Sequence, residues 1–417
     1  MAAATNHVNQ GVMMSRSRFT TLLSSVFLIV ASCSDPTMSS PALTASRDAS
    51  SQASVPTEPL TLEWQARARA LVSAGLLNPL AAERVYAAVS VAQYRAVNAV
   101  AEQVDTDGQL SENGLGEGGR SMIEAQRGAV AGASARVLSF LFPGASESIA
   151  AQVDANANAG RGGVHPHFER GVAIGTAAGD AQVAWLQTDG FTRPWTGTVP
   201  VGHEFWVPAS LPPQGATFGA VRPYLMTSGS QFRPAPPPAF GSPEFNAAVN
   251  EVLTVAQNRT PEQIALARFW NFPAGTPTPP GHWNEIAAAY AAEQRLDESA
   301  AANLFAIMNA AMFDSFIACW EAKYFYWTLR PYQANPAITR VLAPPNHPSY
   351  PSGHACASAA ASSVLSHFFP MHSSELSVML TESGMSRLYA GIHYRFDMTA
   401  GNEIGTGVAQ LALSRGL

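Results

Sequence analysis

The 417-residue chain contains little charge, since only 13% of its residues are Asp, Glu, Lys or Arg. It has 24 basic residues against 30 acidic ones, and no run of lysine or arginine is long enough to follow a phosphate backbone. We therefore expect no nucleic-acid partner. Hydrophobic residues make up 47% of the chain, which predicts an extensive buried core.

Cysteine is also scarce, with three residues in the whole chain. Cys319 and Cys356 lie in small or apolar surroundings, which favours two buried free thiols, with one disulfide between them as the alternative. Neither has the neighbours of a catalytic thiol. The third, Cys33, lies in a segment of a different kind near the N-terminus.

Long hydrophobic runs are missing from most of the sequence, and the exception lies near its start. Arg16 and Arg18 precede an apolar run over residues 19–30, and small residues then lead to Cys33. The run is too short for a comfortable membrane span, so residues 1–32 are predicted to be an export signal. Its end resembles a bacterial lipoprotein processing site, which implies acylation of Cys33 and a lipid-anchored, periplasmic protein. Ordinary signal cleavage with an incidental cysteine is the alternative.

Alanine-rich helical patterns dominate the rest of the chain, and no alternating strand pattern occurs. Residues 33–58 are rich in Ser, Thr, Ala and Pro and are predicted to be a disordered tether to a single domain over 59–417. Residues 190–243 are rich in proline and glycine, and we expect them to be functional or to wrap the core. The sequence predicts an all-α fold of helix bundles. Its helices are expected at about 60–74, 78–103, 121–142, 145–160, 164–188, 243–257, 282–293 and 297–327, with a further start signal at Thr260.

The chemically informative residues fall in three short islands near the end of the chain. Lys323 and Arg330 form the first, seven positions apart and followed by Pro331. On one continuous helix the two cations would lie on the same side, and the proline would end that helix. Both are expected to face one pocket.

The second island is Ser352-Gly353-His354, which comes directly before a run of small residues over 355–363. The run is a plausible helix, whose N-terminus would offer free amides and a positive dipole to an anion. Glycine allows the backbone to approach a ligand closely.

Arg387, His393 and Asp397 form the third island. An arginine presents a planar fork to two oxygens of an oxyanion. The histidine and the aspartate are four apart, so on a helix the carboxylate would fix the imidazole tautomer and leave the other nitrogen free as a nucleophile or a ligand. The three islands together predict an enzyme that encloses a tetrahedral oxyanion.

Over residues 323–397 the islands resemble the signature of the type 2 phosphatidic acid phosphatase and vanadium-dependent haloperoxidase superfamily. A looser likeness to the bacterial vanadium haloperoxidase-like proteins extends back to about residue 60. The resemblance implies a helical-bundle fold and a pocket for vanadate, or for phosphate in the same place. It implies that His393 makes the axial bond to the metal or phosphorus, that His354 is the acid–base residue and that Asp397 orients His393. The residues it implies for the equatorial oxygens are Lys323, Arg330, Ser352, Gly353 and Arg387.

Two chemistries share such a pocket because phosphate and vanadate have the same shape and charge. In a haloperoxidase, vanadate would act as a Lewis acid for hydrogen peroxide, Lys323 would polarise the peroxide oxygen, and halide attack would release hypohalous acid. In an acid phosphatase, His393 would attack the phosphorus of a phosphate ester and His354 would protonate the leaving alkoxide. The long helical region before the islands and the lack of further membrane spans favour an exported haloperoxidase-like enzyme. The exported phosphatase is the alternative, and a non-enzymatic helical scaffold is a third reading.

Three neighbouring residues add partial hints. His347 stands where the algal bromoperoxidases also carry a histidine, whereas Trp320 matches the fungal chloroperoxidases, so the halide is left open. Both residues also fit purely structural roles, His347 in a turn and Trp320 in the core. Asp314 interrupts an apolar helix and is expected to be a partner of a site arginine, or else a cap or surface residue. The organic substrate and the oligomeric state are not specified by the sequence.

Overall fold

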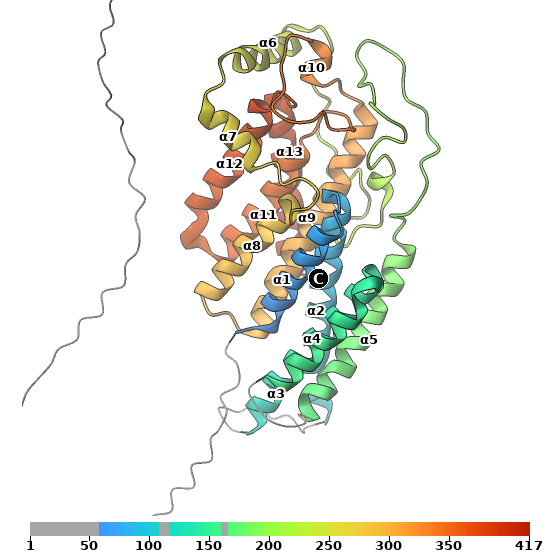
Figure 1. Cartoon of the computed structure of the whole chain (residues 1–417), viewed down its shortest axis with the longest axis vertical. Coiled ribbons are helices and arrows are strands. Elements are labelled where there is room, and N and C mark those ends of the chain that lie inside the picture. The colour runs from blue at the N-terminus through green and yellow to red at the C-terminus, as the bar shows by residue number, and fades with distance from the viewer. Residues whose placement is uncertain (1–57, 108–116, 160–165) are drawn as a thin grey trace, which may run out of the picture. The chain divides into compact units, whose positions relative to one another are not determined.

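A computed structural model describes residues 58–107, 117–159 and 166–417 (Figure 1). The predicted export signal and all but the last residue of the predicted tether lie outside these ranges. Within them the chain forms helices and no β-strand, with isolated bridges joining Phe205 to Thr328 and Ala274 to Thr276. The prediction of an all-α fold is therefore confirmed.

The predicted helices of the N-terminal half are present to within a few residues, and the helix after Thr260 begins with the expected capping box. The helices are α1 (Leu60–Ala74), α2 (Pro79–Asp107), α3 (Glu117–Leu141), α4 (Ser146–Asn158), α5 (Pro166–Thr188), α6 (Pro243–Asn258), α7 (Pro261–Phe269), α8 (Thr278–Glu293), α9 (Glu298–Tyr326), α10 (Pro331–Ala334), α11 (Gly353–Phe368), α12 (Ser373–Tyr389) and α13 (Arg395–Arg415), with short 3-10 turns η1 (Pro143–Ala145), η2 (Phe218–Ala220) and η3 (Pro370–His372).

Helix α9 is the core helix, and it packs against α2, α11 and α13 (Figure 1). Its mean hydropathy reaches 1.4 over an 18-residue window, and it is the one helix in the described ranges that is long and apolar enough to cross a membrane. The expectation that only the N-terminal segment has such hydropathy is therefore wrong. Since 94% of that window is buried inside the protein, its apolar surface is already covered by neighbouring helices.

Helices α3 and α5 pack against each other at glycine residues. Helices α3 and α5 cross closely: a Cβ atom added at Gly128 would lie 2.0 Å from the carbonyl oxygen of Phe168, and one at Gly175 would lie 2.0 Å from that of Ala129. Any side chain at these positions would push the two backbones apart. The small residues of α3 and α5 therefore let the helices of the N-terminal half pack closely.

Buried amides connect this N-terminal group to α9. The Nδ2 atom of Asn309 donates to Ser90 on α2 at 2.8 Å and to Asn284 on α8 at 2.9 Å. The Nε2 atom of Gln65 on α1 donates to the same serine and to Gln93, at 2.8 and 3.0 Å. A shift of one helix along another would leave several of these buried groups unpaired, so the network fixes the register of four helices.

The proline-rich segment over residues 190–242, here called the strap, runs along α9 and is fastened to it. Asp314 accepts the backbone N–H groups of Tyr224, Leu225 and Met226 at 2.8, 2.7 and 2.8 Å. The prediction that this aspartate pairs with a site arginine, or lies in a cap or at the surface, is therefore wrong. It was missed because its partners lie about 90 residues away in a segment without periodic pattern. The strap does wrap the core, as expected.

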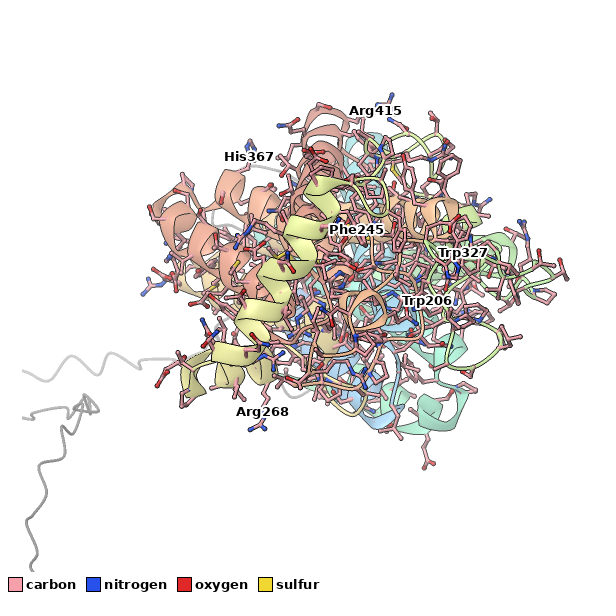
Figure 2. All side chains as sticks on the ribbon, turned by 90° about the horizontal axis from the view of Figure 1, so that it is seen from above. Trp206, Phe245, Arg268, Trp327, His367 and Arg415 are labelled. Atoms are coloured by element: carbon pink, nitrogen blue, oxygen red, sulfur yellow. The ribbon has the colours of Figure 1, made fainter. Side chains whose placement is uncertain are left out.

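Further contacts hold the strap at the C-terminal end of α9. The backbone N–H of Trp206 donates to the carbonyl of Trp327 at 2.8 Å, and the two indole rings lie 6.1 Å apart (Figure 2). Arg233 forms an ion pair with Glu321 and lies 3.7 Å above the ring of Phe325. The strap thus covers the end of α9 that carries the first island.

The buried carboxyl of Glu83 predicts a pH-dependent stability. Among the described residues neither of its oxygens has a hydrogen-bond partner, and burial raises its pKa well above the ordinary value. The folded protein therefore binds this proton more tightly than the unfolded chain does. The resulting stabilisation is complete below the ordinary glutamate pKa and is lost as the pH rises through the folded pKa.

Glu83→Gln should remove this dependence, with a gain over the native protein at pH 8 of about 1–3 kcal/mol and little gain at pH 4. Thermal unfolding at both pH values measures the effect, with the exposed Glu147→Gln as control. An unchanged pH profile in Glu83→Gln would contradict the assignment.

Candidate anion site

The helix that carries the first island ends earlier than predicted. Helix α9 stops at Tyr326, and Trp327 adopts a left-handed conformation with φ 52° and ψ 33°. Lys323 and Arg330 therefore do not share one continuous helix. Pro331 begins α10 and does not end α9, which fits the preference of proline for the first helical position. The two cations are brought together by the turn between the helices.

Lys323 is completely buried in the last turn of α9. Its Nζ atom donates to the carbonyl oxygens of Pro348 at 3.0 Å, Ser349 at 2.8 Å and Pro351. These contacts match the three donors of an ammonium group. Burial lowers its pKa to about 8. The lysine therefore fixes the loop that leads into the second island.

Arg330 bridges the loops on either side of the site. Its Nη1 atom donates to the carbonyl of Ile392 at 2.7 Å and to Nε2 of His393 at 3.0 Å. Its Nε and Nη2 atoms donate to the carbonyl of His347 at 3.1 and 3.0 Å. An arginine only donates, so Nε2 of His393 must be the accepting nitrogen and Nδ1 must carry the hydrogen.

His393 precedes α13 and does not lie on it, contrary to the helical interpretation of its spacing. The contact expected from that spacing still forms, since Nδ1 lies 2.7 Å from Oδ2 of Asp397. The aspartate is in the first turn of α13 and reaches back to the residues before the helix, accepting the N–H of Tyr394 at 3.1 Å and the hydroxyl of Ser349 at 2.6 Å. Burial raises the pKa of Asp397 to about 6. Burial and the nearby Arg330 lower the pKa of His393 well below its ordinary value.

Ser349 was not among the predicted site residues. Its hydroxyl is buried and completes the hydrogen bonding of Oδ2 of Asp397. The only signal in the sequence is its position three residues before Ser352, just ahead of the second island. A lone serine in a proline-rich loop carries too little information to be assigned a role.

The second island forms the N-terminus of a helix, as predicted. Helix α11 begins at Gly353 and Ser352 is its N-cap, yet the serine side chain makes no capping hydrogen bond. Its Oγ atom is buried and has no partner within the described parts of the chain. Such an orphaned donor beside free helix amides is the feature expected where an anion binds.

His354 and Arg387 are held by the chain around α7. Nε2 of His354 lies 2.7 Å from the carbonyl oxygen of Trp270, so this nitrogen carries the hydrogen. Arg387 donates from Nη2 to the carbonyl of Ala267 at 2.7 Å and from Nε to Ser386 at 2.9 Å. Its Nη1 atom has no acceptor among the described residues. Burial lowers the pKa of Arg387 to about 9, which leaves it charged at neutral pH, and lowers that of His354 well below its ordinary value.

A cavity of about 210 Å³ opens between these elements. Four predicted residues line it, namely Gly353, His354, Arg387 and His393, and so do the two hint residues Trp320 and His347. The remaining predicted residues, Lys323, Arg330, Ser352 and Asp397, lie behind this lining. Within the described ranges no aspartate or glutamate lines the cavity. An anion therefore meets hydrogen-bond donors and no opposing carboxylate.

The residues present fit a tetrahedral oxyanion such as vanadate or phosphate. The hydroxyl of Ser352 is a buried donor without an acceptor, and Arg387 points a charged group into the same cavity. Oxyanion oxygens only accept, so they match this donor set. Nε2 of His393 carries the lone pair that a metal or phosphorus centre requires, and a ligand there would replace the hydrogen bond from Arg330.

Removal of Arg387 should weaken oxyanion binding strongly. Hydrogen bonds to charged groups contribute about 1.5–3 kcal/mol, so Arg387→Ala is expected to lower the affinity for orthovanadate and for inorganic phosphate roughly 10- to 100-fold. Calorimetric titration with each anion measures the change. Arg268→Ala is the matched control, because this arginine is exposed and points away from the protein (Figure 2). Native affinity in Arg387→Ala would move the site elsewhere.

Comparisons with known proteins support the same fold. Residues 300–415 match the PAP2 superfamily, whereas no curated protein matches the sequence. A bacterial vanadium-dependent iodoperoxidase structure superposes with a TM-score of 0.71 at 23% identity, covering 87% of this chain and 97% of that one. Two bacterial vanadium-dependent chloroperoxidase structures give a TM-score of 0.64 at 17% identity for the apo form and 0.61 at 16% for the holo form. They cover 81% and 87% of this chain, and 94% of each of those chains. The C-terminal part of this chain thus carries the PAP2 superfamily pattern, on the fold of the bacterial vanadium-dependent haloperoxidases.

Proposed function

We propose that the protein is a vanadate-dependent haloperoxidase-like enzyme that oxidises halide with hydrogen peroxide. The observation that carries the proposal is the buried, unpartnered hydroxyl of Ser352 next to the cavity formed by Arg387, His354 and His393. The fold likeness to an iodoperoxidase over 97% of that chain supports it, because it includes the helices ahead of the three islands. The PAP2 phosphatases share the anion site, so the reaction itself needs a direct test.

The oxyanion would be held by Ser352, Gly353 and Arg387, with Nε2 of His393 as the ligand to the metal. Lys323 and Arg330 would add positive charge from behind the cavity lining, because backbone carbonyls and histidine nitrogens already accept from their donors. Bound vanadate would supply a Lewis-acid centre that activates hydrogen peroxide toward halide. Binding of the oxyanion and transfer of protons are assigned to side chains of the protein.

The protonation of the two histidines follows from their hydrogen bonds. Asp397 holds the hydrogen of His393 on Nδ1, so Nε2 carries a lone pair. In this structure the lone pair accepts from Nη1 of Arg330, and binding of the oxyanion would have to replace that hydrogen bond. His354 carries its hydrogen on Nε2 against the carbonyl of Trp270, so Nδ1 can accept a proton from hydrogen peroxide. Its lowered pKa keeps it neutral at physiological pH, as a proton acceptor requires.

The decisive experiment measures both chemistries on one preparation. Protein stripped of phosphate is assayed for oxidation of bromide and iodide by hydrogen peroxide, with and without orthovanadate, and for hydrolysis of an aryl phosphate. Halide oxidation that requires orthovanadate supports the proposal. Hydrolysis that is inhibited by orthovanadate, with no halide oxidation, would instead establish the alternative, an acid phosphatase with a phosphohistidine intermediate at His393.

We also propose that the protein is exported and anchored in the periplasm through an acylated Cys33. The supporting observation is the order of basic residues, apolar run and cysteine over residues 16–33. Cys33→Ala should lose incorporation of labelled fatty acid and move from the membrane fraction to the soluble fraction, whereas Ser34→Ala should behave as the native protein. A Cys33→Ala protein that stays in the membrane fraction would contradict the proposal.

A further inference from the structure

Part of the cavity lining is apolar, and some of it comes from the short loop after α7. Phe272 and Pro273 line the cavity from this loop, and Leu80 and Pro279 line it from neighbouring elements. The same loop contains Trp270, whose carbonyl oxygen accepts the hydrogen bond from His354. One loop therefore holds the candidate acid–base histidine and forms the apolar wall beside it.

The ring of Phe272 is fixed in place. Its backbone has φ 36°, a left-handed value that is costly for a bulky residue, by about 1–3 kcal/mol. The ring stacks on His282 with centroids 4.6 Å apart and an interplanar angle of 22°. It also makes edge contacts with Phe269 and Trp270, at 5.5 and 6.5 Å. A strained backbone held by three aromatic contacts keeps this ring at the wall of the cavity.

The aromatic group reaches from the cavity to the surface, because Phe269 is 54% exposed. Aromatic rings attract other rings through edge-to-face and offset stacking, by about 0.5–1.5 kcal/mol beyond the burial of area. The cavity also has polar lining, from Arg387 and His393 and from the amides of Asn271 and Gln214. An occupant with one aromatic ring and one polar edge would match both kinds of lining.

The size of the cavity limits the occupant further. A protein cavity of about 150 Å³ accommodates benzene, and this one measures about 210 Å³. It therefore admits a single ring beside a small oxyanion. Since arginine, histidine and amide side chains contribute its polar lining and no described carboxylate does, a neutral or anionic ring is favoured over a cationic one.

We propose that this cavity binds the halogen acceptor itself, a single-ring, electron-rich aromatic compound of the phenol class, with its ring against Phe272. The inference rests on the proposed haloperoxidase function. In the overall reaction one halide ion, one hydrogen peroxide, one proton and the arene give the aryl halide and two waters. The halide is oxidised and peroxide is reduced. A ring C–H bond is replaced by a carbon–halogen bond, and the displaced proton goes into water.

The test is a competition between phenol and a non-aromatic cyclic 1,3-diketone for bromination in one reaction. The product ratio is compared with the ratio given by added hypobromous acid. The native protein should favour phenol about 10-fold relative to the free reagent, and Phe272→Leu should return to the free-reagent ratio, a readout that does not depend on the overall rate. Phe240→Leu is the control, because this half-exposed ring lies on the strap and contacts Phe245. A native ratio equal to that of the free reagent would overturn the inference.

Calorimetric titration of phenol into protein saturated with orthovanadate separates the two proposals, because it requires no turnover. Phenol binding that weakens about 10-fold in Phe272→Leu supports the aromatic site. If phenol binds in this way to a protein that oxidises no halide, the proposed haloperoxidase function is refuted and the aromatic binding site is supported. If halide is oxidised but phenol does not bind, the site fails and the function stands.

Discussion

His393→Ala is expected to show no peroxide-dependent halide oxidation. The substitution removes the nitrogen that Asp397 orients and that faces Nη1 of Arg330. Loss of an outer partner of a metal ligand costs about 10- to 100-fold, so loss of the ligand should cost more than about 100-fold. Asp397→Asn tests the outer partner directly and is expected to fall within that smaller range. Initial rates of triiodide formation under saturating orthovanadate measure both.

Two further variants make this result specific. His354→Ala should lose turnover but keep part of the affinity for orthovanadate, because His354 is assigned to proton transfer and not to ligation. His367→Ala should retain native activity, since this histidine is exposed and lies at the surface (Figure 2). An active His393→Ala protein would refute the assignment of the site.

Asp314→Ala is expected to be among the most destabilising single substitutions in the chain. It strips the acceptor from three consecutive backbone N–H groups, of which those of Leu225 and Met226 are in buried contacts. A buried donor left unpaired costs about 1–3 kcal/mol, so a loss of about 3–5 kcal/mol is expected. The shift in the denaturant midpoint measures it.

Asp314→Asn is the matched variant, because it keeps the shape of the side chain and one accepting oxygen. Its stability should fall between those of the native protein and Asp314→Ala. An Asp314→Ala protein within about 1 kcal/mol of the native stability would show that the strap does not depend on this carboxylate. The strap also supplies Gln214 to the cavity wall, so a loosened strap should lower activity as well.

Local signals in the sequence were sufficient for most helices. The capping box at Thr260 and the small-residue run after Gly353 each predicted a helix start that is present. These signals work because a cap or an amphipathic period involves residues only a few positions apart. The continuous helix expected through Lys323 and Arg330 failed for the opposite reason. The turn at Trp327 is held by the backbone of Trp206, more than a hundred residues away.

In the candidate site, too, contacts between residues close in sequence were predicted and contacts between distant segments were not. The three islands predicted which residue types gather at the candidate anion site. The spacing of His393 and Asp397 predicted their contact, even though the helix begins after the histidine. The position of Ser349 close to Ser352 was too weak a signal to predict that its hydroxyl bonds Asp397. It also gave no reason to separate the residues that line the cavity from those behind it.

By itself, the sequence determined an all-α chain and a set of residue types suited to an oxyanion, because helix periodicity and motif spacing depend on residues close together in the chain. Only the tertiary structure decided that Lys323 fastens a loop, that Asp314 fastens the strap and that Phe272 faces the cavity. Each of these side chains has a strong chemical preference but many potential partners. Which partner it meets depends on how distant segments pack, and that is settled by the burial of the whole core.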